Sequence, residues 1–201
     1  MLLLSIAALV AFLVWQWSVR RSFSPSDPAA REHLDRLLAA ADVLSWNDAE
    51  VRRRVELSAS DPEQYFERHG DAFGAPSEVW PYAVFCEELI QRGLAVRGAD
   101  HDAPTLDLCR RFDPILARCG LSGFDWSALR SVGSGDSVES FLSEVAVALR
   151  SNGLALVHIH DGSINLIVTA HPEARFAAID GTLGPKNAYV IRSWPTGAAP
   201  L

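Results

Sequence analysis

The chain has 201 residues, 49% of them hydrophobic, and a formal net charge of −7. This length suits one ordinary domain with a sizeable core. The acidic balance argues against a nucleic-acid partner, because such proteins present Lys and Arg to the phosphates. Cys86, Cys109 and Cys119 are an odd number of cysteines with no CxxC pair, so the sequence indicates neither a disulfide framework nor a zinc knuckle.

Residues 1–19 form an uncharged, apolar stretch. A helix of this length extends about 28 Å, close to the roughly 30 Å hydrocarbon core of a bilayer. Trp15 and Trp17 stand where interfacial aromatic residues gather, and Arg20 and Arg21 follow directly. We therefore predict a transmembrane anchor that contacts the lipid bilayer through this stretch and ends at the arginine pair.

The alternative for the same stretch is a cleaved signal peptide, which requires a positively charged start and a cleavage site between small residues. No Lys or Arg precedes the apolar run, and the nearest small-residue site, at Ser22 to Ser24, is followed by Pro25. The positive-inside rule places Arg20 and Arg21 in the cytoplasm. We therefore expect a single-pass protein of the bacterial inner membrane, with its domain in the cytoplasm, where unpaired cysteines are stable.

Helix-start signals recur after the anchor (1–21) and a short polar linker (22–27). Each of three Asp-Pro pairs, at Asp27, Asp61 and Asp113, joins a capping aspartate to a proline suited to the first helical position. The segment from Ser45 to Asp48 resembles a capping box. These signals predict helices near residues 28–42, 46–57, 62–69 and 114–119.

Hydrophobic periodicity predicts the other elements. An apolar stripe indicates a helix over 77–92, with Glu88 facing away from the core. The remaining elements are a strand from Leu94, a helix over 137–151, a hairpin over 154–169, a helix near 172–180 and a strand over 188–194. Together they predict one helix-rich α+β domain over 28–194, with helices on one face of a small, mostly antiparallel sheet, and a flexible tail over 195–201.

A run of three arginines, 52–54, lies in the second predicted helix. Asp48 is four residues before Arg52, and Glu50 is four residues before Arg54, a spacing that favours ion pairs along a helix. The run is therefore interpreted as a solvated helix face. The alternative interpretation is a patch that binds an anionic ligand.

Two short motifs suggest phosphate chemistry but lack essential residues. The segment AAIDGTLG, residues 177–184, resembles the DxDGT signature of haloacid-dehalogenase-type phosphatases, but Ala178 occupies the position of the nucleophilic aspartate. In VGSGDS, residues 132–137, Val138 replaces the last glycine of a GxGxxG phosphate loop. The first is rejected, and the second is interpreted as a connector.

The segment LVHIHDGSINLIVTAHPE, residues 156–173, carries three histidines. If Asp161-Gly162 is a two-residue type I′ turn, Ile159 pairs with Ile164. Side chains alternate along a strand, so His158 and His160 then share a polar, solvent-facing side near the tip. The hairpin accounts for this pattern without a ligand.

The same two histidines, His158 and His160, are the candidate metal ligands of the chain. Zinc in a hydrolase is held by three protein ligands and keeps an open position for water. His171 lies about 20 Å along the hairpin, too far to join them. A third ligand would have to come from elsewhere, and the candidates are Asp100, His101, Asp125, His33 and His69.

From about Tyr82 to Leu183 the chain resembles an uncharacterised bacterial family of small α+β proteins. The resemblance rests on Glu87-Glu88-Leu89 with Gly93-Leu94, on Phe124-Asp125-Trp126, and on Leu156 to Ser163 with the helix after Pro172. It implies a cytoplasmic α+β domain without an established activity, and it carries over no catalytic residues.

The sequence thus indicates no catalytic residues and no cofactor. We expect a membrane-anchored, non-enzymatic module that binds a protein partner, as in immunity-type inhibition, or senses a small ligand. The alternative is a metal-dependent hydrolase that uses His158 and His160.

Overall fold

The computed structural model describes residues 28–99, 106–129, 137–160, 165–183 and 189–195. The predicted anchor (1–21), with Trp15, Trp17, Arg20 and Arg21, therefore lies outside the described residues, as do the linker and most of the predicted tail. Within the described ranges, no helix is both long enough and apolar enough to cross a bilayer.

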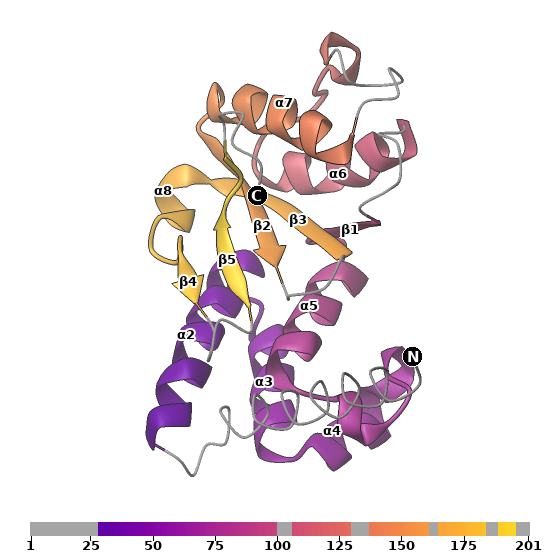
Figure 1. Cartoon of the computed structure of the whole chain (residues 1–201), viewed down its shortest axis with the longest axis vertical. Coiled ribbons are helices and arrows are strands. Elements are labelled where there is room, and N and C mark those ends of the chain that lie inside the picture. The colour runs from indigo at the N-terminus through magenta and orange to yellow at the C-terminus, as the bar shows by residue number, and fades with distance from the viewer. Residues whose placement is uncertain (1–27, 100–105, 130–136, 161–164, 184–188, 196–201) are drawn as a thin grey trace, which may run out of the picture.

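Helices dominate the first part of the described chain (Figure 1). They are α2 (Pro28–Leu44), α3 (Ala49–Ser60), α4 (Pro62–His69) and α5 (Pro81–Gln91), with the short 3₁₀ turns η1 (Gly70–Ala72) and η2 (Pro76–Glu78) before α5. The second part contains α6 (Leu106–Arg118), the 3₁₀ turn η3 (Trp126–Ala128), α7 (Val138–Arg150) and α8 (Glu173–Phe176).

Five strands form one antiparallel sheet in the order β1-β3-β2-β5-β4. Their bounds are β1 (Val96–Ala99), β2 (Leu154–His160), β3 (Asn165–Pro172), β4 (Thr182–Leu183) and β5 (Val190–Ser193). The predicted α+β class with a small antiparallel sheet is therefore confirmed.

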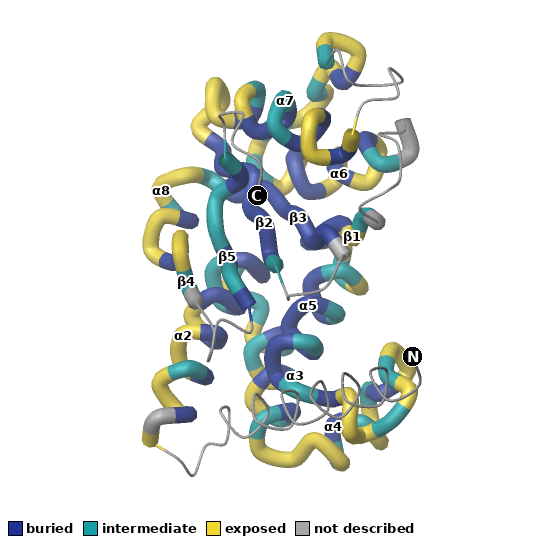
Figure 2. The backbone as a smooth tube through the Cα atoms, viewed as in Figure 1, coloured by how far each residue is buried: buried dark blue, intermediate teal, exposed yellow. Residues whose placement is uncertain are grey.

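Helices cover both faces of this sheet, so the prediction that they cover one face is wrong. Side chains that alternate along β2 enter two separate cores. Val157 and Ile159 pack with α2, α3 and α5, whereas Leu154 and Leu156 pack with α6 and α7. Figure 2 shows the resulting continuous burial along β2. A strand covered on both sides is expected to be an apolar run, and LALVHIH is nearly one.

The predicted hairpin is present, but its register differs from the prediction. Ile159 pairs with Ile167, not with Ile164, and Val157 pairs with Thr169. The two-residue turn is therefore wrong, because residues 161–164 separate the two strands. A shift by three residues moves the side chains of β3 to the opposite face, since they alternate with a period of two. The Asp-Gly signal in the sequence is outweighed by burial of apolar side chains on both faces.

Capping residues explain several helix starts. Asp61 accepts a hydrogen bond from the backbone N of Gln64 and begins α4, and Ser137 does the same for α7 through Ser140. The helix expected from residue 46 begins three residues later, with Asp48 as its N-cap. Trp46 and Asn47 both have φ of +63°, which is incompatible with a helix.

Three other helices differ from their predicted bounds. The helix expected over 77–92 starts at Pro81, after η2, and the helix expected from 114 starts at Leu106 and contains Pro114 in its interior. The helix expected near 172–180 is reduced to α8, because β3 continues through Pro172.

Candidate functional site

The two candidate histidines lie at the end of β2. Their ring centroids are 5.5 Å apart, and the ring of His158 is 5.2 Å from that of Trp194. His158 is only 2% exposed, so the prediction that it faces solvent is wrong. The cause is the cover that α6 and α7 provide on this face of the sheet.

A third metal ligand is not brought to this pair by the described residues. Among them, no group of three or more His, Cys, Asp or Glu side chains is placed to hold a metal ion. Asp125 instead accepts hydrogen bonds in the turn that begins η3. His33 and His69 belong to α2 and α4, and Asp100 and His101 lie outside the described ranges.

The cysteines offer no exposed nucleophile in the described structure. Cys86 and Cys109 are buried, and Cys119 is half-buried with its thiol 3.2 Å from the carbonyl O of Ala170. Burial raises the pKa of the Cys109 thiol, and it raises the pKa of Cys119 to about 11. Reactive cysteines require the opposite shift.

A surface groove of about 510 Å³ lies between α3, α4 and the start of α5, and we call it the α4–α5 groove. One wall is made by Ser58 and Ala59 at the end of α3 and by Pro62 and Glu63 at the start of α4. The other wall is made by residues 75–77 and 79–81. The groove is mainly apolar, and Glu63 is its only charged lining residue among those described.

Three prolines shape the walls of the α4–α5 groove. Pro62, Pro76 and Pro81 each occupy the first turn of α4, η2 or α5. Proline fixes its own φ and suits this position, so the chain turns sharply and rigidly at each helix start. Trp80, half-buried, lies between two of these turns with its ring 5.4 Å from that of Tyr82. These turns fix the backbone conformation at the groove walls.

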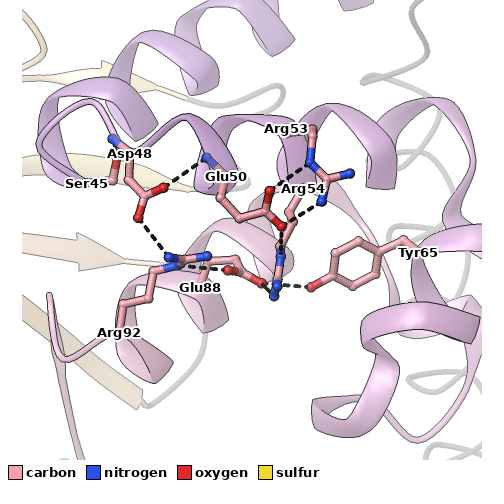
Figure 3. Close-up of polar contacts among 8 residues, drawn as sticks. All are labelled: Ser45, Asp48, Glu50, Arg53, Arg54, Tyr65, Glu88 and Arg92. Atoms are coloured by element: carbon pink, nitrogen blue, oxygen red, sulfur yellow. Dashed lines mark hydrogen bonds and ion pairs between the residues drawn. The ribbon is translucent and has the colours of Figure 1, made fainter.

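A buried carboxylate joins α3, α4 and α5, the three helices that contribute to the groove (Figure 3). Glu88 on α5 is 2% exposed and accepts hydrogen bonds from Arg54 of α3 at 2.9 Å, from Tyr65 of α4 at 3.3 Å and from Arg92 at 3.2 Å. A buried charge requires such partners, because desolvation otherwise costs several kcal/mol. The predicted outward orientation of Glu88 is therefore wrong.

The network extends along α3 in alternating charges. Arg54 also pairs with Glu50, which pairs with Arg53, while Arg92 reaches Asp48 at 2.8 Å. Hydrogen bonds from Arg53 and Arg54 lower the pKa of Glu50 to about 2. Three arginines and three carboxylates cancel, so the network has no net charge to attract an anion. It fixes the positions of the helices around the groove.

The predicted ion pairs of the arginine run are found in part. Glu50–Arg54 is present at 2.8 Å. Arg52, however, pairs with Asp42 and Glu56 and not with Asp48, which caps α3 and binds Arg92. Arg54 turns inward to Glu88, so the run is only partly the solvated face that its spacing predicts.

A scan against family models matches residues 33–184 to a family described as a domain of unknown function, DUF6630. This match covers more than half of the chain. The chain belongs to the DUF6630 family. No curated protein and no solved structure matches it.

The DUF6630 match begins at residue 33, well before the resemblance seen from Tyr82 onward. It therefore includes α3 and α4, and with them both walls of the α4–α5 groove. Sequence reasoning missed this groove because its walls come from separate segments. The sequence does contain a signal for the Glu88 network. Glu88 lies four residues before Arg92, in a helix whose other inward positions are apolar.

Proposed function

We propose that this DUF6630 domain is a non-enzymatic binding module and that its partner is a protein segment seated in the α4–α5 groove. The groove itself carries this proposal: it is open, mainly apolar, and fixed by prolines and by the Glu88 network. The side chains that could act in catalysis, His158 and the cysteines, are placed differently. His158 and the cysteines contribute to the cores, as structural residues do.

The form of the groove favours an extended protein segment over a small molecule. Small-molecule sites are concave and bury most of the ligand surface. The α4–α5 groove is instead partly open to solvent, and its walls contain three prolines and Trp80. Grooves lined by aromatic rings are one of the recurring sites at which extended peptides bind. Immunity-type inhibition of a partner is one biological role that such binding would serve.

The module is proposed to work at the cytoplasmic surface of the inner membrane, tethered by residues 1–21. Support comes from the uncharged run that ends in Arg20 and Arg21. Fusions of alkaline phosphatase and of green fluorescent protein to the C-terminus test this topology. Fluorescence without phosphatase activity is expected, and the reverse pattern would contradict it.

Site-specific photo-crosslinking in cells tests the binding function. A benzophenone amino acid at Ser77, which lines the groove, is expected to capture one defined protein, identified by mass spectrometry. The same group at Val147, an exposed residue of α7, is the matched control. Trp80→Ala in the Ser77 background should remove the adduct. Equal capture from Ser77 and Val147, or an adduct insensitive to Trp80→Ala, would contradict the proposal.

A further inference from the structure

Acidic residues are frequent in the chain segment that carries the walls of the α4–α5 groove. Residues 58–81 contain five Asp or Glu and one Arg, which gives this segment a formal charge of −4. All five carboxylates are on exposed residues: Asp61, Glu63, Glu67, Asp71 and Glu78. Glu63 lines the groove, and Glu67 lies one helical turn further along α4. The chain as a whole carries −7, so more than half of this net charge comes from the segment that carries the groove walls.

Two of these carboxylates make local contacts with described residues that do not neutralise them. Asp61 accepts from the backbone N of Gln64, and Glu78 accepts from the backbone N of Gly74 at 2.9 Å. A backbone N–H is a dipole without net charge, so each carboxylate keeps its charge. This arrangement contrasts with the Glu88 network, where Arg54 and Arg92 balance Glu88.

The backbone at the groove lacks hydrogen-bond donors at three positions. Pro62, Pro76 and Pro81 have no N–H, so these wall positions supply no backbone donor. Opposing contributions come from the N-termini of α4 and α5, where each helix dipole amounts to roughly half a positive charge. Together they amount to about one positive charge, against a formal charge of −4 for residues 58–81. The groove therefore favours a partner that supplies donors and positive charge.

We propose that the occupant of the α4–α5 groove is an extended, cationic segment of the partner protein, in which Lys or Arg alternate with apolar residues or proline. The apolar side chains would contact the proline and Trp80 surfaces, and the cations would face Glu63, Glu67 and Glu78, which lies between the lining residues 77 and 79. This inference rests on the proposed binding function and specifies the chemistry of its partner. Exposed ion pairs contribute about 0.2–1 kcal/mol each, so three of them favour the cationic segment by roughly tenfold.

Three labelled peptides test the inference with the full chain in a non-ionic detergent. They are three repeats of Pro-Leu-Lys, and the same peptide with every Lys replaced by Gln or by Glu. Fluorescence polarisation is expected to give about tenfold tighter binding for the Lys peptide than for the Gln peptide. The Glu peptide should bind more weakly than both. Raising the salt concentration should reduce the difference, because salt screens exposed charges.

Variants test whether Glu63 and Glu67 cause the preference for the Lys peptide. Glu63→Gln combined with Glu67→Gln should reduce the preference for Lys over Gln to less than about threefold, because two of the facing charges are removed. The matched control is Glu139→Gln with Glu173→Gln, on α7 and α8, which changes the net charge equally and should retain the preference. Trp80→Ala should weaken binding of the Lys and Gln peptides alike. A preference that the two double variants reduce equally would show a general charge effect and overturn the inference.

The remaining outcomes separate this inference from the binding function. No measurable binding of the Lys peptide, or equal binding of the Lys and Glu peptides, overturns the cationic occupant. If the Ser77 crosslink still captures a partner and Trp80→Ala removes it, the binding function stands without this partner chemistry. If the Lys peptide binds more tightly but the Ser77 crosslink captures no partner, the result contradicts the binding function in cells.

Discussion

The carboxylate of Glu88 on α5 lies 2.9 Å from a guanidinium nitrogen of Arg54 on α3, and this pair is the centre of the contact between the two helices. The Glu88 side chain is 2% exposed, whereas that of Arg54 is 23% exposed. Arg92 and Tyr65 also donate hydrogen bonds to this carboxylate. Removal of one partner from such a group leaves a buried charge uncompensated, which is far more costly than loss of a surface pair.

We expect Glu88→Gln to lower the free energy of unfolding by about 2 kcal/mol, because Arg54 and Arg92 lose charge-assisted hydrogen bonds to the buried carboxylate, although Arg54 keeps its pair with Glu50 and Arg92 its pair with Asp48. The matched control is Glu56→Gln, which breaks the exposed pair with Arg52 and should cost less than about 0.5 kcal/mol. Tyr65→Phe should cost about 1 kcal/mol, the usual value of one hydrogen bond. Urea unfolding followed by circular dichroism measures all three. Equal costs for Glu88→Gln and Glu56→Gln would contradict the role given to Glu88.

These contacts show why the sequence predicts only part of the molecule. The start of α4 depends on Asp61 and Pro62, which are neighbours in the chain, so it was predicted correctly. Glu88 receives its partner Arg54 from 34 residues away, and no local pattern reveals that contact. The hairpin register likewise depends on helices that cover both faces of β2. Local signals predict the helices and strands. Non-local packing determines which of their faces are buried and where the groove lies.

His171 provides a pH-dependent prediction. Its ring is fully buried, stacks on Trp46 with centroids 4.9 Å apart, and donates from Nε2 to the carbonyl O of Leu44 at 3.2 Å. Burial lowers its pKa to about 4, with a smaller contribution in the same direction from Arg175. The unfolded chain therefore takes up a proton between about pH 6.5 and 4 that the folded chain does not.

We therefore expect the free energy of unfolding to fall as the pH drops from 6.5 to 4, by about 3 kcal/mol from His171 alone. Urea unfolding at several pH values measures this slope. His171→Gln should be less stable at pH 7 but should show a shallower slope over the same range. Glu50 does not affect the comparison, because its lowered pKa changes the stability only between about pH 4.5 and 2. Parallel slopes for the two proteins would contradict the assignment.

The two histidines of β2 should differ in their effect on stability. His158 is 2% exposed beside Trp194, whereas His160 is half-buried at the end of the strand. We expect His158→Gln to cost about 2 kcal/mol and His160→Gln less than about 0.5 kcal/mol, as is usual for core and peripheral positions. Thermal unfolding at pH 7.5 measures this difference. Similar small costs would mean that His158 faces solvent after all.

The cysteines should be nearly inert in the folded protein. The raised pKa of Cys119, about 11, leaves roughly one thiol in a thousand ionised at pH 8, whereas a free cysteine of pKa about 8.5 is about one quarter ionised. Cys109 is buried, and its pKa is raised in the same direction. We therefore expect the thiol reagent DTNB to react at pH 8 at least about a hundredfold more slowly with the folded chain than with the chain in guanidinium chloride.

Cys119→Ser, which removes the half-buried thiol, should reduce the small early reaction in the folded state. A thiol that reacts completely at the rate of the unfolded chain would instead identify an activated cysteine, and the protein would then need a nucleophilic role that the binding function does not include.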